Sequence, residues 1–345
     1  MLLKHMRSAC NQIASPWDSG EVGDGAVGSG KCRRTHVSGH GYLYEVDEKS
    51  NLDTARTLMC ADSYRYEFCY TRSFDTRLIS NLMYLGFIPL SQLSTTDHTY
   101  GMIPKLHKHR CVLHLPDLKI DKSARKRMKH FQISINKCFD QVIDECVRVN
   151  GDGWLTKPLV KALKLLHRTP QCSAIRLCSF EIYNNGQLVG GEVGFTAGTA
   201  YTSLSGYFTM SSAGTVQMIA TCKILQSAGF AFWDLGMDLP YKRTMGGVTH
   251  PIQDFLAVFD TVRCLPTPPL PSSVLDVRDT VTSSGAQERV YKQRQNCTHI
   301  RTAQCEKTLS HSVPNVSNSW ANRKCRTVNS TELSVPNIIK LPHAA

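Results

Sequence analysis

The sequence has no run approaching the roughly 20 consecutive apolar residues with which a helix spans a membrane. Its first residues, MLLKHMRSACNQ, lack the apolar stretch of a secretory signal. The 14 cysteines include no Cys-x-x-Cys pair, the spacing found in many zinc and redox sites. These absences exclude a membrane protein and a small disulfide-stabilised domain. We therefore expect reduced thiols and a cytoplasmic location.

Acidic residues are fewer than basic ones. The 28 Asp and Glu against 40 Lys and Arg give a formal net charge of +12. This balance favours a polyanionic partner over a neutral small substrate alone. The 345 residues, 41% of them hydrophobic, are enough for one large domain or two small ones.

Apolar periodicity is missing at both ends of the chain. Residues 1–60 are rich in Gly, Ser and charged residues, and residues 266–345 begin with PTPPLPSS and continue with mostly polar residues. Such segments cannot bury enough apolar area to offset the entropy lost when they become ordered. We expect both ends to be disordered and the folded part to lie in residues 61–265.

Between these limits, helical and strand patterns alternate. Helices are expected over residues 75–85, where Asp75 is the cap, and over 138–147, 157–166 and about 213–227. Strands are expected over residues 109–115, 131–135, 173–183, 188–195, 200–208 and 230–235. The turns Asn184-Asn185-Gly186 and Ala197-Gly198-Thr199 predict two hairpins. Together these patterns predict a mixed α+β fold.

Two short motifs look like ligand sites but lack the context that such sites need. The segment from Gly25 to Cys32 is close to a phosphate-binding loop, yet no strand precedes it and no helix follows. A flexible linker is the favoured interpretation. His107, His109 and Cys111 alternate and would share one face of a strand. Without further ligands, a basic strand is favoured over a metal site, so we expect no metal.

A basic segment at residues 121–130 has a more informative spacing. Lys122, Lys126 and Lys129 would form one stripe on a helix, with Arg125 beside it. Such a stripe can follow a phosphate backbone, but it can equally be a solvated helix face. From the spacing alone, both interpretations stay open.

Residues 107–256 contain a series of motifs in a fixed order. They are Arg110-Cys-Val-Leu113, CFDQVIDEC at 138–146, Gly153-Trp154-Leu-Thr156, Leu188-Val-Gly-Gly191, Gly198-Thr199, Thr244-Met-Gly-Gly247 and Asp254-Phe-Leu256. In order and spacing this region resembles the leucyl/phenylalanyl-tRNA–protein transferases. Upstream, the segment from Asp75 to Pro89 is similar to that family's small N-terminal domain.

The resemblance implies a fold and a reaction. It implies a small N-terminal subdomain in residues 61–104 and, in residues 105–265, a domain similar to the GNAT acyltransferases, with a mostly antiparallel sheet flanked by helices. The family moves leucine, phenylalanine or a similar apolar residue from tRNA to the N-terminal α-amine of a protein, which marks that protein for degradation. Acceptors carry N-terminal Arg or Lys. The polyanionic partner would be aminoacyl-tRNA, and no cofactor, no membrane contact and a monomer are implied.

Several site residues follow from the resemblance. Trp154 would stack on the terminal adenosine, although a buried core Trp is also possible. Asp234 matches the family's active-site Asp, where a carboxylate can orient the attacking amine, and a turn Asp is the alternative. Substrate-binding positions further include Leu204, Gly206 and Gly236. The basic stripe would occupy the tRNA-facing helix.

The chain also departs from the family pattern. The bacterial form has Gln at the position of Gly236, Met at Glu192 and Glu at Leu204. If the hairpin turns at residues 197–199, Glu192 and Leu204 would lie opposite each other, with Cβ atoms about 5 Å apart. Our hypothesis is that Glu192 supplies the negative charge that receives the cationic acceptor N-terminus, so Glu192 and Asp234 are the expected catalytic residues. Lys242 and Arg243 replace uncharged family residues and would contact phosphate or form a solvated turn.

Two other functions stay open. A GNAT acetyltransferase needs a loop that binds the pyrophosphate of acetyl-CoA, but the segment from Arg243 to Val248 fails that motif at its last position and the segment after Ser211 fails at its first. The second alternative is a diverged family member that binds tRNA or N-terminal peptides without catalysis. The residues at Gly236 and Leu204 keep this alternative open.

Overall fold

The computed structural model describes residues 33–37, 41–94 and 98–282. The glycine-rich segment 25–32, and with it residues 1–32 and 283–345, lies outside this part of the chain, so the expectations for these residues stay predictions. None of the described helices has both the length and the hydropathy that crossing a membrane requires.

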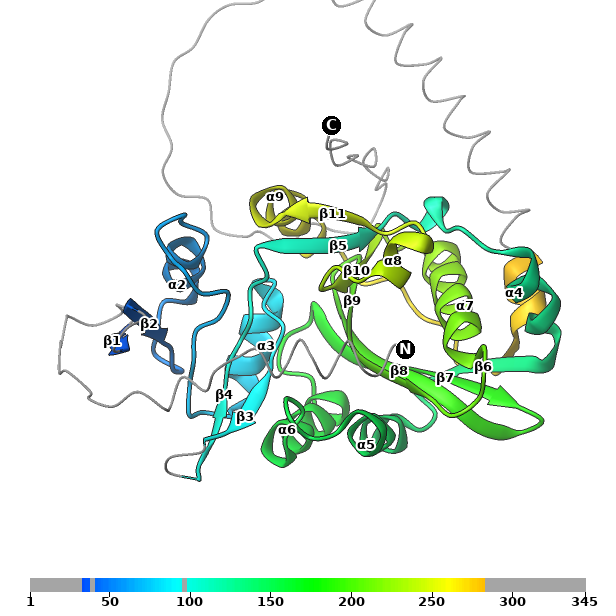
Figure 1. The fold of residues 1–345 in the computed structure, drawn as a ribbon, viewed down its shortest axis with the longest axis horizontal. Coiled ribbons are helices and arrows are strands. Elements are labelled where there is room, and N and C mark those ends of the chain that lie inside the picture. Colours follow the sequence, from blue (N-terminus) through cyan, green and yellow to red (C-terminus); the bar gives the residue numbers. More distant parts are fainter. Residues whose placement is uncertain (1–32, 38–40, 95–97, 283–345) are drawn as a thin grey trace, which may run out of the picture. The chain divides into compact units, whose positions relative to one another are not determined.

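One sheet of eight strands forms the centre of the described residues (Figure 1). Its strands are β5 (His109–Leu113), β6 (Phe131–Ile135), β7 (Ile175–Asn184), β8 (Gln187–Ala197), β9 (Ala200–Phe208), β10 (Phe232–Gly236), β11 (Val248–Pro251) and β12 (Leu275–Asp276). Their order across the sheet is β11-β5-β10-β9-β8-β7-β6-β12. Every neighbouring pair is antiparallel except β9 and β10, which are parallel. The predicted α+β class with a mostly antiparallel sheet is confirmed.

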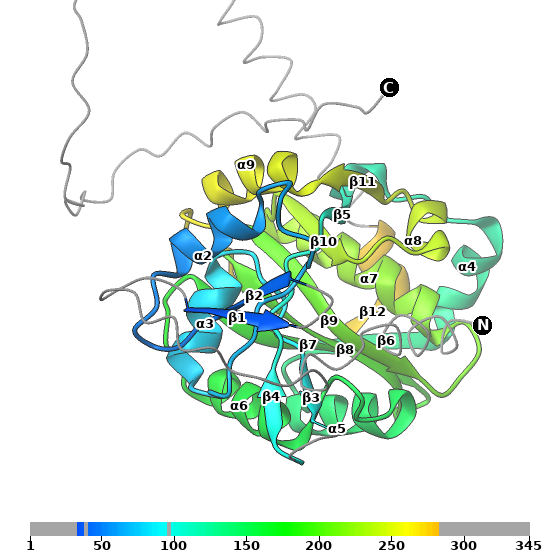
Figure 2. The same cartoon turned by 60° about the vertical axis from the view of Figure 1, so that its left-hand side comes forward.

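Helices cover both faces of this sheet (Figures 1 and 2). They are α2 (Leu52–Met59), α3 (Thr76–Tyr84), α4 (Lys122–Arg127), α5 (Phe139–Asn150), α6 (Lys157–Arg168), α7 (Ala213–Ala228), α8 (Pro240–Thr244) and α9 (Ile252–Val262). Side chains of α3, α5, α6 and α9 belong to one hydrophobic core, and those of α4 and α7 belong to a second. In Figure 1, α5 and α6 lie below strands β7 and β8, and α7 lies above them. The sheet therefore separates the two cores.

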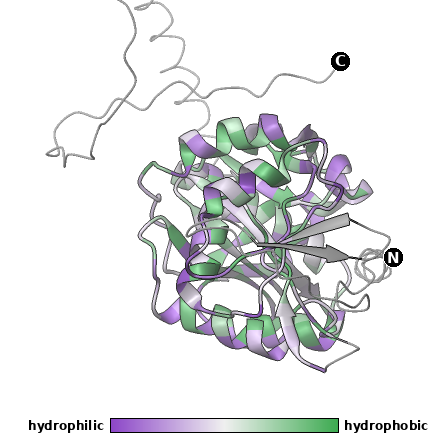
Figure 3. Cartoon of the chain, turned by 90° about the vertical axis from the view of Figure 1, so that its left-hand side faces the viewer, coloured by the Kyte–Doolittle hydropathy of each residue, from purple (hydrophilic) through white to green (hydrophobic). Residues whose placement is uncertain are grey.

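Helices α3 and α6 begin and pack where the sequence predicts. Asp75 caps α3 by accepting hydrogen bonds from the backbone of Arg77 and Leu78 at 2.8 and 3.0 Å. Pro158 stands in the first turn of α6, where its missing N–H is not needed. The buried residues of α6 are Leu159, Ala162, Leu163 and Leu166, spaced three or four apart. Figure 3 accordingly shows hydrophobic and hydrophilic residues side by side along the helices at its lower edge.

The two predicted hairpins are confirmed. Asn185 and Gly186 both have positive φ angles, 49° and 76°, between β7 and β8. Gly198 turns the chain between β8 and β9 with φ of 55°. A Cβ atom there would lie 2.2 Å from the carbonyl oxygen of Val262, so only glycine fits this turn.

A β-bulge changes the predicted register of β8 and β9. Gly194 pairs with Ser203, but Val193 pairs with Ser205, so Leu204 is an extra residue without a partner across the pair. Glu192 consequently pairs with Gly206. The prediction that Glu192 lies directly opposite Leu204 is wrong, because the two-residue turn at Gly198 and Thr199 shifts the register by one residue and the bulge shifts it by one more.

The parallel strands β9 and β10 pair only at their beginnings. Residues 200–202 of β9 pair with residues 232–234 of β10, and beyond this point β9 pairs with β8 alone. The polar backbone groups of the two separated ends therefore face a gap in the sheet rather than each other. This separation is the feature that positions the candidate site.

The folded region extends beyond the expected limits of residues 61 and 265. Ala55 and Met59, one turn apart on α2, are buried in the same core as Leu82. At the other end, β12 pairs with β6, and Val277 is fully buried. These segments are too short for their sequence pattern to indicate order. Their order comes from packing against elements that lie far away in the chain.

The remaining described strands form two small pairs, β1 (Arg33–Val37) with β2 (Gly41–Glu45), and β3 (Ser91–Leu93) with β4 (Tyr100–Met102). The described residues up to Val281 fall in one compact unit. The expected boundary between a subdomain at 61–104 and a domain at 105–265 therefore stays a prediction.

Candidate active site

A cavity of about 640 Å³ opens where β9 and β10 separate. Residues 203–208 of β9 and 235–237 at the end of β10 form two of its walls. The first turns of α7 and the short helix α8 form two others. A space bounded by the diverging ends of two strands is open to substrate and rigidly framed at the same time.

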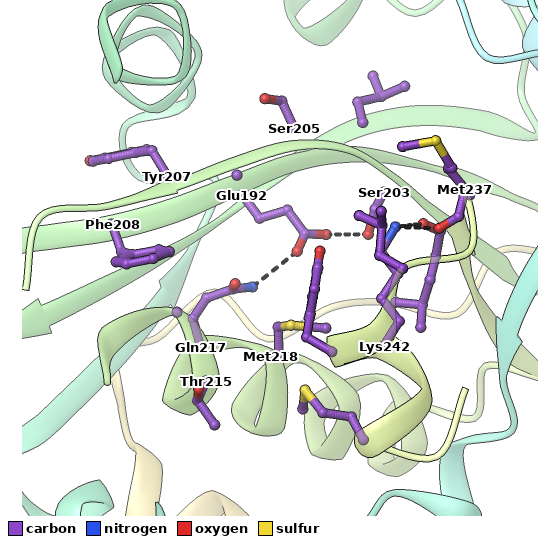
Figure 4. Close-up of a pocket in the computed structure, with 18 of the residues that line it drawn as sticks. Glu192, Ser203, Ser205, Tyr207, Phe208, Thr215, Gln217, Met218, Met237 and Lys242 are labelled. Carbon is purple, nitrogen blue, oxygen red and sulfur yellow. Dashed lines mark hydrogen bonds between the residues drawn. The ribbon is translucent and has the colours of Figure 1, made fainter. Parts of the chain in front are cut away.

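Glu192, on β8, is an acidic residue of the cavity lining (Figure 4). Only 6% of its surface is exposed. Its Oε1 accepts hydrogen bonds from Tyr201 Oη at 2.9 Å and Ser203 Oγ at 2.7 Å, and its Oε2 accepts one from Gln217 Nε2 at 3.3 Å. Burial raises the pKa of Glu192, while these hydrogen bonds and Lys242 act in the opposite direction.

The donors to Glu192 are themselves held in place. Ser203 Oγ accepts a hydrogen bond from Trp233 Nε1 at 2.7 Å, and Gln217 Nε2 lies 2.9 Å from Thr221 Oγ1. All three donors to the carboxylate are uncharged. A carboxylate has about four acceptor positions, so Glu192 keeps capacity for a further donor from the cavity. A positively charged group is the ligand that this arrangement suits best.

Lys242 lines the same cavity but is not a surface residue. It is 8% exposed, and its Nζ donates to the backbone oxygens of Leu235 and, at 2.8 Å, of Met237. Burial lowers its pKa. The interpretation of Lys242 as part of a solvated turn is wrong, because α8 packs this side chain inward, whereas its contact with tRNA phosphate stays a prediction. Its neighbour Arg243 is exposed and pairs with Asp238, so its contact with tRNA stays a prediction.

Trp154 is a buried core residue that also lines the cavity, so its stacking on the terminal adenosine stays a prediction. Its side chain is 9% exposed, belongs to the first hydrophobic core and also lines the cavity. Its backbone oxygen accepts hydrogen bonds from Ser91 N at 2.9 Å and Ser91 Oγ at 3.1 Å. The ring is therefore held rigidly at the cavity wall.

Asp234 lies away from the cavity. It is fully buried and is absent from the cavity lining. Its Oδ1 accepts from Gly236 N at 2.8 Å and lies 3.3 Å from Arg110 Nε, and its Oδ2 accepts from Thr202 Oγ1 at 3.0 Å. Successive side chains of a strand point to opposite faces, and Trp233 bonds to Ser203 beside Glu192. Asp234 consequently points away from Glu192, and the structure does not bring the two expected catalytic carboxylates together.

The three remaining substrate-binding positions all line the cavity: Leu204, Gly206 and Gly236. Leu204, the bulged residue, also packs against the first hydrophobic core. Gly236 has φ of 72°, and its N–H is held by Asp234. Asp234 thus shapes the cavity through the backbone that follows it.

The basic stripe begins beside the cavity. Lys122, Arg125 and Lys126 are exposed on α4, and Lys129 is exposed on the single 3-10 turn that follows. Asp121 caps α4 through Ala124 N at 2.6 Å and also lines the cavity. The helix is shorter than the sequence suggests, but its exposed cations stay in one continuous segment.

The His107 and Cys111 motif does not form a metal site. Within the described part of the chain, no group of three or more potential ligands of a metal ion comes together. His107 instead lies with its Nδ1 3.6 Å from Glu67 Oε2, and burial lowers its pKa to about 4. Burial raises the pKa of Glu67, but hydrogen bonds from His107 and the Lys108 amide outweigh this and lower it to about 2. Lys105, which pairs with Glu67, lines the cavity with His107.

Sequence reasoning missed the three donors to Glu192. Tyr201 and Ser203 alternate on β9, so the sequence indicates that their side chains share one face. It does not indicate the register of β8, and therefore not that Glu192 lies beside them. Gln217 lies four residues before Thr221 on a helix that is buried nearly all round. A polar pair on such a helix is the one signal that could have indicated a buried polar site.

The family model and the curated relatives that match this chain carry the same description. The family model described as "Leucyl/phenylalanyl-tRNA protein transferase" matches residues 112–260. A protein of that name from Rhizorhabdus wittichii is 25% identical over 194 residues, which cover 55% of this chain and 75% of the relative. A second, from Stutzerimonas stutzeri, is 30% identical over 147 residues, 41% of this chain and 63% of the relative. A third, from Chlorobaculum tepidum, is 27% identical over 177 residues, 50% of this chain and 86% of the relative. The match thus spans less than two thirds of the second relative.

Solved structures show a weaker likeness. The C-terminal domain of a putative lysylphosphatidylglycerol synthetase from Agrobacterium fabrum aligns with TM-score 0.30 and 12% identity, over 73% of this chain and 82% of that one. A probable N-acyltransferase from Enterococcus faecalis aligns with TM-score 0.29 and 12% identity, over 72% and 59%. At these TM-scores the likeness supports no conclusion about this chain.

Proposed function

We propose that this chain is a member of the leucyl/phenylalanyl-tRNA–protein transferase family and that it transfers an amino acid from aminoacyl-tRNA to the N-terminal α-amine of a protein. The observation that carries the proposal is the cavity between β9 and β10, where a buried carboxylate held by three uncharged donors faces the space. Glu192 would receive the positive charge of the acceptor N-terminus.

The rest of the cavity suits an apolar amino acid on tRNA. Ile88, Leu90, Met218 and Met237 line it together with Phe208, and these side chains would contact the side chain of leucine or phenylalanine. Trp154 would stack on the terminal base. Binding both reactants in one rigid space places the amine beside the ester carbonyl, which supplies a large part of the rate in acyl transfer.

The exposed cations of α4 would hold the tRNA itself. Their segment begins at Asp121, which lines the cavity, so a tRNA whose 3′ end enters the cavity would place its backbone near Lys122 and Lys126. Phosphate contacts of this kind give affinity without reading the sequence of the nucleic acid. Arg243, exposed on α8, would add a contact on the other side.

The acceptor would be a protein with N-terminal Arg or Lys, and the transfer would mark it for degradation. The support for a cationic acceptor is the charge of Glu192 and the absence of a charged donor among its three hydrogen-bond partners. Asp234 would act indirectly in this scheme, by fixing the backbone of Gly236 at the cavity wall.

The test uses the full-length protein with radiolabelled leucyl-tRNA or phenylalanyl-tRNA and a peptide that begins with Arg. A matched peptide with an acetylated N-terminus is the control. Label on the free-amine peptide alone is the expected result. Retention of tRNA without product on any peptide contradicts the proposal and supports a binding protein, and transfer of label from acetyl-CoA instead supports an acetyltransferase.

A further inference from the structure

Lys242 is a buried amine at the cavity wall rather than a surface cation. Its Nζ donates to the backbone oxygens of Leu235 and Met237, the two residues that flank Gly236. An uncharged amine has two N–H groups and one lone pair. When both N–H groups are directed to these oxygens, the lone pair is left for the cavity that Lys242 lines.

The charged groups around Lys242 each have another partner. Asp234 pairs with Arg110, and Asp238 pairs with Arg243. Glu192 accepts from three uncharged donors. Cys111 stays a neutral thiol, because burial raises its pKa to about 11. Among the described residues, no carboxylate therefore forms an ion pair that would fix Lys242 in its charged form.

These surroundings decide the protonation of Lys242. Burial lowers its pKa, and Cys111, Asp234, Glu192 and Asp238 raise it by smaller amounts, so the net shift is downward. A lysine with a lowered pKa gives up its proton at a lower pH than an exposed lysine does.

The proposed reaction needs a group that moves one proton. An amine that attacks an ester must lose a proton after the new bond forms, and the departing oxygen of tRNA must gain one. Gly236 offers no side chain for this purpose. We propose that Lys242 takes this proton from the acceptor nitrogen and delivers it to the 3′ oxygen of the tRNA, an assignment that rests on the proposed function.

The step balances without another reactant. The acceptor ammonium first releases one proton to solvent, and the uncharged nitrogen then forms a bond to the ester carbonyl carbon. Lys242 Nζ takes a proton from that nitrogen. The bond from the carbonyl carbon to the 3′ oxygen breaks, and its electron pair leaves with the oxygen. That oxygen takes the proton from Lys242, so the products are the amide and a free tRNA hydroxyl.

Three variants test the assignment. Lys242→Met keeps the length of the side chain without a base, and Lys242→Arg keeps the donors and the positive charge but cannot give up a proton. Both are expected to lower kcat for leucine transfer by about 100- to 10,000-fold. Affinity for tRNA and KM for the peptide should keep their wild-type values. Lys223→Met is the matched control, because Lys223 is equally buried on α7 and bonds Gln226 outside the cavity.

Two outcomes overturn the proposal. If Lys242→Arg transfers leucine at the wild-type rate, the residue acts through its charge and not as a base. If small amines such as ethylamine fail to restore any transfer to Lys242→Ala, while the variant keeps its fold and its tRNA affinity, Lys242 has only a structural role. Partial restoration that increases with the concentration of uncharged amine is the expected result.

The wild-type protein gives a measurement that needs no variant to fold. An aminooxy-terminated peptide has a nucleophile that stays uncharged near neutral pH, so kcat with this acceptor reports on the enzyme alone. We expect kcat to rise with pH to a plateau below the ordinary lysine pKa, and a kcat independent of pH overturns the proposal. If the wild-type protein transfers no amino acid at any pH, the proposed function itself fails, which is distinct from a failure confined to Lys242.

Discussion

Replacing Glu192 by glutamine removes the negative charge of the cavity while nearly preserving the volume of the side chain. In the structure this carboxylate faces the space where the acceptor amine would bind. A hydrogen bond to a charged group contributes about 1.5–3 kcal/mol. Since 1.4 kcal/mol corresponds to a factor of ten, Glu192→Gln should lower kcat/KM for an Arg-terminated peptide by about 10- to 150-fold.

The pH dependence of transfer should report the same group. The carboxylate receives a cation only when it is ionised, and burial raises its pKa above the usual value for glutamate. The kcat/KM of the wild-type protein should therefore fall as the pH decreases through this raised pKa. Glu192→Gln cannot ionise, so this acidic limb of the profile should disappear in the variant.

The contribution of Glu192 to stability should change with pH in the opposite direction to kcat/KM. A carboxyl group whose pKa is higher in the folded than in the unfolded state contributes stability below the unfolded pKa and loses it as the pH rises through the folded pKa. The stability of the wild-type protein relative to Glu192→Gln should therefore decrease with rising pH over that range. Urea unfolding at a series of pH values measures this difference.

A second buried glutamate provides the control. Glu181 on β7 is fully buried and accepts hydrogen bonds from the hydroxyls of Ser134 and, at 2.5 Å, Ser179, but it does not line the cavity. Glu181→Gln should alter stability without changing the kinetics toward the peptide. If Glu192→Gln retains the wild-type kcat/KM and its acidic limb, Glu192 does not bind the acceptor and the reasoning is refuted.

Three further predictions concern the walls of the cavity and the tRNA. Trp154→Phe keeps a ring in the core but should weaken binding of aminoacyl-tRNA through the lost stacking, which is about 1–3 kcal/mol per base, as a filter-binding titration measures. Lys126→Ala should reduce the slope of log K for tRNA binding against log salt concentration by the amount of about one phosphate contact. Replacing Lys161, an exposed lysine on α6, by alanine should leave this slope unchanged. Asp234→Ala leaves Arg110 buried without its partner and should lower the free energy of unfolding by about 3–5 kcal/mol, measured by urea unfolding. At a temperature where the variant stays folded, its kcat should change little.

Elements delimited by local signals were predictable from the sequence. Asp75 begins α3 because its side chain reaches two N–H groups within the next three residues. Asn185 and Gly186 form their turn because both residues adopt positive φ at little cost. In each case the atoms that decide the structure lie within a few residues, so no knowledge of distant contacts is needed.

The register of β8 and β9 was not predictable in the same way. A turn at Gly198 and Thr199 with uninterrupted pairing would place Glu192 opposite Ser205, and the bulge at Leu204 moves the partner to Gly206. The bulge leaves Leu204 packed against the first core, which is assembled from α3, α5, α6 and α9. The position of the bulge depends on packing against four distant helices, so the local sequence pattern does not predict it.

The candidate site was predicted in part. Trp154, Glu192 and Gly236 do line one cavity, because the motifs around them set the ends of neighbouring elements. Asp234 was expected there as well, but a strand alternates its side chains, and only the separation of β9 from β10 determines which face becomes the cavity. Lys242 looked like a surface residue for a similar reason, since five residues of α8 cannot reveal which side packs inward.

The separation of β9 and β10 also explains how Glu192 and the amine of Lys242 can remain buried without pairing with each other. Glu192 is fixed from β9 and α7 by Ser203 and Gln217, while Lys242 is fixed by the backbone oxygens that follow β10. If the strands paired along their full length, the cavity would close and no substrate could reach either buried group. With the strands apart, an amine and an ester carbonyl can enter between the two groups. In the proposed reaction, these reactants would supply the missing partners of both groups.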